Sequence, residues 1–157
     1  MLNDYLQFAK TQTKEETSSI NLKNLLDQIK YKLDNNNLSL INLEDVYIKG
    51  RPSSLGRCFE NVIQNGLTYG KKVYVNIQKS SNRVIVIIED DGPGIPEDQF
   101  RNVFKPFFRL DKSRNLNKSG VGLGLAIVED IINSHGGNIQ LSKSKYKGLQ
   151  VKISLPF

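Results

Sequence analysis

Residues 88–95 read Ile-Glu-Asp-Asp-Gly-Pro-Gly-Ile, and residues 120–124 read Gly-Val-Gly-Leu-Gly. The first stretch ends a continuous apolar run that is typical of a central strand, and the second precedes apolar residues at helical spacing. Places of this kind can direct free backbone N–H groups toward a bound anion. A single glycine cluster is usually only a turn, so the two stretches become informative through a third element, a helix that carries two asparagines.

Asn61 and Asn65 are four residues apart on a predicted helix that opens at Pro52-Ser53-Ser54, with a serine as its cap, and ends near Gly70. Side chains at this spacing lie on one face of the helix, and this face is offset from the apolar stripe. An amide oxygen is a suitable ligand for Mg²⁺, which takes one or two protein oxygens when phosphates and water fill its other positions. The alternative is that both asparagines are solvated surface residues.

Asp90 and Asp91 place carboxylates at the end of the predicted strand, directly before a glycine turn. A carboxylate at this place can accept a hydrogen bond from the exocyclic amino group of adenine, which hypoxanthine lacks. Gly92 and Gly94 would let the backbone approach a base closely. The alternative is an acidic turn without a ligand.

Gly120, Gly122 and Gly124, followed by Leu125, place free N–H groups and a helix N-terminus where phosphates can bind. The stretch is neither the dinucleotide fingerprint G-x-G-x-x-G nor the P-loop G-x-x-x-x-G-K-[ST]. A loop that only reverses the chain is the alternative.

A long polar and basic loop covers residues 105–119 and carries Arg109 and Arg114. Its hydrophobic start, Phe104-Lys105-Pro106-Phe107-Phe108, is followed by cations, which suits a lid that closes over a triphosphate. A solvated basic loop would have the same composition.

Hydrophobic periodicity predicts the order of helices and strands along the chain. The other expected helices cover residues 1–10, 21–34, 96–104 and 123–134, and the expected strands cover residues 38–43, 46–49, 73–77, 84–88, 139–141 and 149–155. Residues 11–19 are polar without periodicity and are predicted to form a linker. This order favours an α+β fold, a two-layer α/β sandwich whose mixed, mostly antiparallel sheet has helices on one face only.

The composition, with 38% hydrophobic and 24% charged residues, is that of a soluble globular domain. No apolar run approaches the roughly 18 residues of a membrane span, and we expect no membrane contact from this segment. The net charge of +6 permits an anionic partner, but no Lys/Arg block interleaved with aromatic residues favours a nucleic-acid surface. The lone Cys58 excludes an internal disulfide.

Four segments resemble, in order and spacing, the sequence boxes of bacterial sensor histidine kinases. They are Asn61–Gly70 (N box), Glu89–Ile95 (G1 box), Val103–Arg109 (F box) and Gly120–Ala126 (G2 box). Residues 1–10 resemble the end of the second helix of the dimerisation and phosphoacceptor domain in osmosensor-type members. The resemblance implies that residues 1–19 are the end of that helix and a linker, and that residues 20–157 are an ATP-binding catalytic domain with the fold of the gyrase, Hsp90 and histidine kinase superfamily.

The resemblance implies ATP and Mg²⁺ as ligands and gives roles to individual residues. Asn65 would bind Mg²⁺, Asn61 would lie near the phosphates, and Asp90 rather than Asp91 would contact adenine, since Asp90-x-Gly92-x-Gly94 has the spacing of the box. The other residues implied at the nucleotide are Tyr69 beside it, Arg109 and Arg114 near the phosphates, and Gly120, Gly122, Gly124 and Leu125 under them. Arg109 joins the two asparagines as a residue implied in catalysis. Thr68 stands where many members have Lys or Arg, which leaves a phosphate contact at that position open.

The chain has one histidine, His135, and it lies outside the H-E-x-x-T/S-P context of a phosphoacceptor. We expect it to cap the last helix or to lie on the surface. The chain is therefore expected to bind ATP and to supply the γ-phosphoryl group to a histidine on a separate dimerisation domain of the same parent kinase, without autophosphorylating alone. The resemblance further implies a response regulator as an indirect partner, a cytoplasmic position for this domain and a parent protein in the bacterial inner membrane.

Two other functions stay open, a non-catalytic nucleotide-sensing module and a superfamily ATPase. Members that hydrolyse ATP have glutamate at the position of Asn61, where it acts as the general base for water. A neutral imidazole is already a nucleophile and needs less help. Glu60 is about 100° around the helix from Asn61 and should not replace it as a base. Asn61 therefore favours transfer to histidine over hydrolysis.

Overall fold

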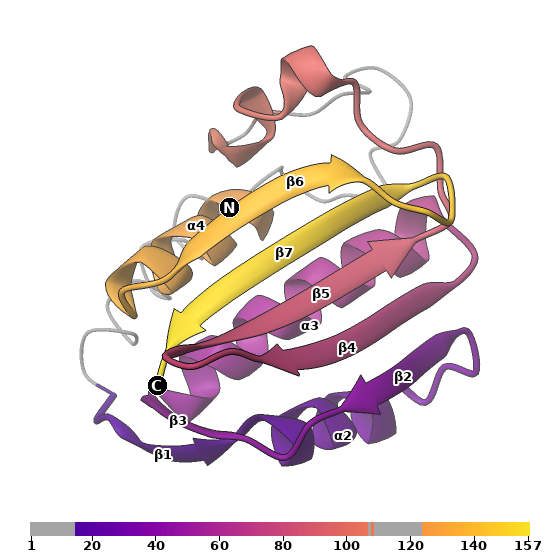
Figure 1. Cartoon of the computed structure of the whole chain (residues 1–157). Helices are drawn as coiled ribbons and strands as arrows, with labels where there is room; N and C mark the ends of the chain where they lie inside the picture. Colours follow the sequence, from indigo (N-terminus) through magenta and orange to yellow (C-terminus); the bar gives the residue numbers. More distant parts are fainter. Residues whose placement is uncertain (1–14, 107, 109–123) are drawn as a thin grey trace.

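The computed structural model describes residues 15–106, 108 and 124–157. In this part of the chain a five-stranded sheet has the order β2-β4-β5-β7-β6 (Figure 1). Its strands are β2 (Leu38–Leu43), β4 (Val73–Lys79), β5 (Arg83–Asp90), β7 (Leu149–Pro156) and β6 (Asn138–Lys143). β2 and β4 run parallel, whereas the β4–β5, β5–β7 and β6–β7 pairs are antiparallel. The predicted α+β fold with a mixed, mostly antiparallel sheet is confirmed.

The described α-helices lie together on one face of this sheet (Figure 1), as predicted. They are α2 (Leu22–Leu33), α3 (Pro52–Tyr69) and α4 (Gly124–Ser134). Because side chains alternate along a strand, every second residue of the central strands meets the helices. The core between the two layers includes Leu26, Phe59, Ile63, Val75, Val86, Ile131 and Ile153. None of the helices in the described ranges is long and apolar enough to cross a membrane.

α2 begins and ends where its sequence predicts. The Asn21 side chain accepts a hydrogen bond from the Asn24 N–H at 3.0 Å and so caps the first turn. Asp34, with φ of 45°, adopts the left-handed conformation that ends the helix, directly before Asn35-Asn36-Asn37.

Residues 96–104 do not form the single short helix that was predicted. They form two 3-10 turns, η1 (Glu97–Gln99) and η2 (Asn102–Phe104). Val103 is the one residue of this segment that is buried. Because a short segment with a single buried residue gains little from a regular α-helix, it forms 3-10 turns instead.

The predicted linker over residues 11–19 is wrong at its end, because Ser18 and Ser19 belong to a strand. β1 (Ser18–Asn21) pairs antiparallel with β3 (Tyr47–Gly50) in a small two-stranded sheet. Ile20 is the one buried residue of β1. One apolar residue among polar ones shows no alternation, so the strand depends on its partner. The predicted helix over residues 1–10 lies outside the described residues.

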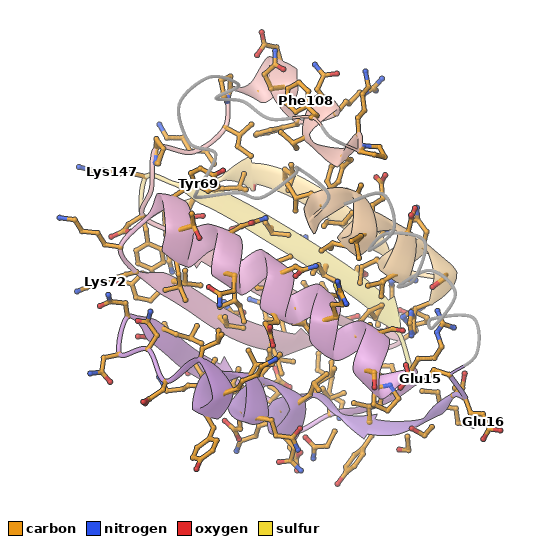
Figure 2. The ribbon with its side chains drawn as sticks, turned by 180° about the vertical axis from the view of Figure 1, so that it is seen from behind. Glu15, Glu16, Tyr69, Lys72, Phe108 and Lys147 are labelled. Carbon is orange, nitrogen blue, oxygen red and sulfur yellow. The ribbon has the colours of Figure 1, made fainter. Side chains whose placement is uncertain are left out.

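The N-terminus of α3 is not capped by a serine, contrary to the prediction. Arg51 is its N-cap residue and makes no side-chain capping hydrogen bond. The Glu15 carboxylate instead accepts hydrogen bonds from the Ser53 N–H at 2.9 Å and the Ser54 N–H at 3.1 Å. Pro52 at the first helical position has no N–H to satisfy. Glu15 therefore replaces a local cap and ties the start of the described chain to α3, at the opposite end of the helix from Tyr69 (Figure 2).

Replacing Glu15 with alanine should lower the free energy of unfolding by about 1 kcal/mol, the usual value of a helix cap. Burial pushes the pKa of Glu15 up, but the hydrogen bonds from Ser53 and Ser54 outweigh it and hold the pKa below its ordinary value of 4.5. The contribution should thus be complete above pH 4.5 and be lost as the pH falls through the lower folded-state pKa. Urea unfolding of E15A measures it. E16A is the matched control because Glu16 is exposed, and equal loss in both variants would contradict the assignment.

His135 joins the C-terminus of α4 to the start of α3. Its Nε2 accepts a hydrogen bond from the Arg51 N–H at 3.0 Å, so the neutral ring carries its proton on Nδ1. That nitrogen lies 2.7 Å from the carbonyl oxygen of Ile131 and donates to it. The expected capping role is confirmed, because His135 satisfies a carbonyl in the last turn of α4.

The stability of the domain should fall as His135 becomes protonated, because a proton on Nε2 removes the acceptor for Arg51. Burial lowers the pKa of His135 and the charge of Arg51 lowers it further, against the opposing effects of Ile131 and Glu15. The folded-state pKa of His135 is therefore below the ordinary 6.5. Unfolding is accompanied by proton uptake at pH values between the folded-state pKa and 6.5. Urea unfolding between about pH 5.5 and 7.5 should show this loss for the unmodified chain. H135F should be less stable at pH 7 but have a flatter profile, and identical slopes would refute the link.

Candidate functional site: a carboxylate acceptor and an amide at a helix N-terminus

Asn61, Asn65 and Tyr69 follow one another at four-residue spacing along one side of α3. The side-chain amide of Asn65 lies against Gly124, the first residue of α4. A Cβ atom built on Gly124 would lie 3.5 Å from Asn65 Nδ2 and 4.0 Å from Asn65 Oδ1. The predicted metal ligand is thus placed at the N-terminus of an eleven-residue helix, whose first-turn N–H groups have no partners within the helix.

The carboxylate of Asp90, the last residue of β5, is fixed at one oxygen. Oδ1 accepts hydrogen bonds from the Gly92 N–H at 2.9 Å and the Leu149 N–H at 3.3 Å. No group in the described part of the chain donates to Oδ2, which would lie 3.6 Å from a Cβ built on Gly66 of α3. One oxygen therefore remains as an acceptor on the helix side of the sheet.

Burial raises the pKa of Asp90, and the charge of Asp91 adds to this rise against the hydrogen bonds from Gly92 and Leu149. A raised pKa means that the ionised carboxylate costs stability at neutral pH. Carboxylates of this kind are frequent at functional sites.

Asp91 has a different environment from its neighbour. Its Oδ1 accepts hydrogen bonds from the Lys71 N–H at 2.7 Å and the Lys72 N–H at 2.9 Å. The hydrogen bond from Lys72 is the main reason that the pKa of Asp91 lies below its ordinary value. Asp91 thus fixes the turn between α3 and β4, which fits the expectation that Asp90, and not Asp91, meets a base.

Close backbone contacts join the end of α3 to the loop that follows Asp90. A Cβ on Gly92 would lie 2.8 Å from the carbonyl oxygen of Tyr69, and one on Gly70 would lie 2.8 Å from the Gly92 nitrogen. Gly94 has φ of +74°, a conformation that L side chains rarely adopt. The loop is therefore fixed next to Tyr69, whose side chain is 44% exposed.

Several of the predicted site residues meet in space, and others cannot be placed. Asn65 contacts Gly124, Asp90 faces Gly66, and Tyr69 adjoins the Gly92 backbone. Leu125 follows Gly124 in α4. Arg109, Arg114, Gly120 and Gly122, with most of the expected lid, lie outside the described residues.

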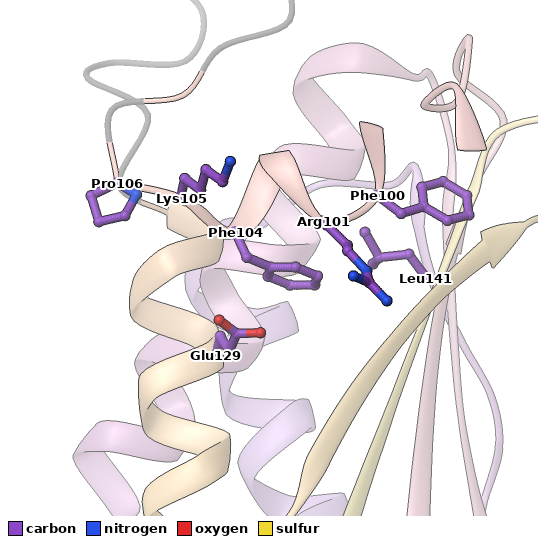
Figure 3. A pocket seen from close by; sticks show the side chains of 7 residues that line it. All are labelled: Phe100, Arg101, Phe104, Lys105, Pro106, Glu129 and Leu141. Carbon is purple, nitrogen blue, oxygen red and sulfur yellow. The ribbon is translucent and has the colours of Figure 1, made fainter. Parts of the chain in front are cut away.

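A cavity of about 440 Å³ lies elsewhere, between α4, β6 and the two 3-10 turns (Figure 3). It is lined by Phe100, Arg101, Phe104, Lys105, Pro106, Glu129 and Leu141. Burial, and then the neighbouring charge of Asp130, raise the pKa of Glu129. Neither Asn65 nor Asp90 lines this cavity, so it is not the predicted nucleotide site.

Sequence reasoning missed the part that Gly148 and Leu149 have in this site. The Leu149 N–H binds Asp90 Oδ1, and the Gly148 N–H donates to the Asp90 carbonyl oxygen at 3.2 Å. These contacts join residues 58 and 59 positions apart. A glycine directly before an alternating strand was the one available signal, and by itself it indicates only a turn.

The converging groups suit a nucleoside triphosphate with Mg²⁺. In the described ranges no cluster of three or more His, Cys, Asp or Glu residues could hold a metal ion by itself. Asn65 offers the site an amide oxygen, and Mg²⁺ is commonly held by one or two protein oxygens together with phosphates and water. The N-terminus of α4 beside Asn65 is a suitable place for those phosphates.

Known proteins are similar to this chain in sequence and in fold. Residues 50–157 match the family model described as "Histidine kinase-, DNA gyrase B-, and HSP90-like ATPase". The chain is 36% identical to the sensor histidine kinase GtrS of Pseudomonas aeruginosa over 107 residues, covering 68% of this chain and 22% of GtrS. It is 31% identical to the sensor histidine kinase CpxA of Escherichia coli in an alignment of 166 positions, gaps included, which covers 99% of this chain and 36% of CpxA.

A solved structure, the histidine kinase domain of the E. coli osmosensor EnvZ, superposes with a TM-score of 0.68 at 31% identity, covering 88% of each chain. The chain belongs to the histidine kinase-, DNA gyrase B- and HSP90-like ATPase family, because the family model matches more than half of its length. It spans about a third or less of the length of the curated relatives GtrS and CpxA.

Proposed function

We propose that this domain binds Mg²⁺ and ATP and supplies the γ-phosphoryl group to a histidine on a separate dimerisation domain of a two-component sensor kinase. The observation that carries the proposal is the pairing of two features beside consecutive residues of α3, Asn65 and Gly66. One is Asp90 Oδ2, to which no described group donates a hydrogen bond, and the other is the Asn65 amide at the start of α4. They suit the two ends of a nucleotide, its base and its phosphates.

In this proposal Asp90 Oδ2 accepts a hydrogen bond from the 6-amino group of adenine, and Tyr69 lies beside the nucleotide. Asn65 supplies an oxygen to Mg²⁺, and Asn61 lies one helical turn away near the phosphates. Bound Mg²⁺ would neutralise phosphate charge, and the N-terminus of α4 would add its partial positive charge.

The phosphate contacts of Arg109, Arg114, Gly120, Gly122, Gly124 and Leu125 are part of the same proposal. Arg109 would stabilise charge on the transferred phosphoryl group, and the glycine segment would offer its N–H groups. The catalytic contribution of this domain is therefore positioning and charge neutralisation rather than covalent chemistry.

Transfer is favoured over hydrolysis because position 61 holds an asparagine and not a carboxylate that could act as a general base. The nearest candidate along the helix, Glu60, forms an ion pair with Lys32 of α2, with 2.9 Å between Oε1 and Nζ. This ion pair holds Glu60 on the α2 side of the helix.

The proposed partners are the dimerisation and phosphoacceptor domain of the same parent kinase and, indirectly, a response regulator. The proposed position is cytoplasmic, with the parent protein in the bacterial inner membrane. The names of GtrS and CpxA as sensor histidine kinases support the assignment of this chain to a sensor kinase.

Radiolabelled ATP with a phosphoacceptor domain supplied in trans tests the proposal. Titration calorimetry should first show Mg²⁺-dependent ATP binding to the chain alone, without acid-labile phosphate on it. Adding the acceptor domain should then yield phosphohistidine on that domain. Release of free phosphate instead would indicate an ATPase, and binding without either product would indicate a nucleotide-sensing module.

A further inference from the structure

The turn that joins β6 to β7 holds the end of β5 from both faces of the sheet. On the face without described helices, Ser144 Oγ donates a hydrogen bond to Glu89 Oε2 at 2.7 Å. On the helix side, the Leu149 N–H donates to Asp90 Oδ1. The Gly148 N–H also donates to the Asp90 carbonyl oxygen. Because Glu89 and Asp90 are consecutive strand residues, their side chains lie on opposite faces, and one turn fixes both.

The contact between Ser144 and Glu89 is buried, with 4% and 6% of these residues exposed. The Ser144 hydroxyl also accepts a hydrogen bond from the Tyr146 N–H at 3.0 Å. The Tyr146 ring stacks on Tyr74, the cross-strand neighbour of Glu89, with 4.0 Å between ring centroids. The hydroxyl therefore links the turn to the sheet at a place that water scarcely reaches.

Stability alone does not account for this contact. A buried carboxylate is costly unless it is well hydrogen-bonded, and within the described residues the Glu89 carboxylate has Ser144 as its one hydrogen-bond partner. An apolar pair of similar volume would avoid that cost. The pair does, however, place the turn in one position, since a hydrogen bond between buried groups is lost entirely if either group moves away.

The position of the turn is transmitted directly to Asp90. A Cβ on Gly148 would lie 2.0 Å from Asp90 Oδ1 and 2.4 Å from the Asp90 carbonyl oxygen. The turn backbone thus packs against the carboxylate without intervening space. A small shift of the turn would break the Leu149 hydrogen bond and let the carboxylate rotate.

We propose that Ser144 is a positioning residue for base recognition. Through Glu89 it fixes the β6–β7 turn, the turn holds Asp90 Oδ1, and Oδ2 is thereby aimed at the amino group of a 6-aminopurine. This inference rests on the proposed function, in which Asp90 contacts adenine. It predicts that removing a hydroxyl on the far face of the sheet alters the choice between purine bases.

The test compares the affinities of ATP and ITP, which carries a 6-oxo group, for the unmodified chain and for S144A. S144A should bind ATP about fivefold more weakly, the value of one hydrogen bond, and bind ITP as before. Ser144→Thr keeps the hydroxyl and should restore the ratio, while Ser144→Cys, with a weaker donor of similar shape, should lie between. S142A is the matched control, because Ser142 is hydrogen-bonded to Gln150 at 3.0 Å and not to Glu89.

A double-mutant cycle separates positioning from general loosening of the domain. In a D90A background the S144A change should no longer affect ATP affinity, because there is no carboxylate left to position. An unchanged ATP to ITP ratio in S144A, or equal weakening of both nucleotides, would overturn the role of Ser144. Absence of any preference for ATP over ITP in the unmodified chain would instead overturn the adenine contact itself, and with it the proposed function on which this inference rests.

Discussion

Asp90→Asn is expected to weaken ATP binding by about 100-fold and to shift the preference of the site toward ITP. The Gly92 and Leu149 N–H groups both donate to Oδ1, so they should select the amide oxygen of the new side chain for that place. The amide NH₂ group then takes the place of Oδ2 and presents a donor to the base. A donor repels the 6-amino group of adenine but suits the 6-oxo group of hypoxanthine.

Binding titrations with ATP and ITP measure this change of base preference, and D91N is the matched control. Asp91 Oδ1 accepts hydrogen bonds from the Lys71 and Lys72 N–H groups. D91N should therefore lose some stability without a change in base preference. D90N should be no less stable than the unmodified chain at neutral pH, because burial raises the pKa of Asp90 and the charge is costly to the fold. Equal preferences in D90N and D91N would show that Asp90 does not read the base.

The layered fold could be predicted from the local sequence pattern because apolar residues recur at the spacing of each strand or helix. Val84, Val86 and Ile88 are buried along β5, and Val73, Val75 and Ile77 are buried along β4. Each element thus carries in its own sequence the face that it packs. The same holds for α2, whose cap and stop signals are adjacent to the helix.

The features that prediction missed depend on residues far apart in the chain. Ser53 and Ser54 have the composition of a cap, yet Glu15, 38 or 39 positions earlier, takes that place. β1 has one apolar residue and is a strand only because β3 lies beside it.

The same difference between local patterns and contacts of distant residues applies to the candidate site. Asn65 and Asp90 could be chosen from motif spacing, since each motif is local. Their surroundings could not, because Leu149 reaches Asp90 across 59 positions and Gly124 reaches Asn65 only once α4 has packed on α3. Local motifs therefore point to candidate residues, while tertiary contacts decide which oxygen of a carboxylate stays available.

Asn65→Ala should abolish the dependence of ATP affinity on Mg²⁺ and slow phosphoryl transfer to an acceptor domain by about 100-fold. The Asn65 amide lies against Gly124, at the end of α4 that would meet the phosphates in the proposed function. Removing it should leave the proposed base contact of Asp90 intact. ATP should consequently still bind, with the same affinity in Mg²⁺ as in a chelator.

Gln64→Ala is the matched control, since Gln64 carries an exposed amide one position earlier on the same helix. It should retain both Mg²⁺ dependence and transfer, because a shift of about 100° around the helix points its side chain elsewhere. Binding with and without chelator isolates the metal effect, and the rate of phosphohistidine formation isolates the catalytic one. Transfer by N65A at the rate of Q64A would mean that the metal is held by residues other than Asn65, and the N-terminus of α4 would lose its place in the mechanism.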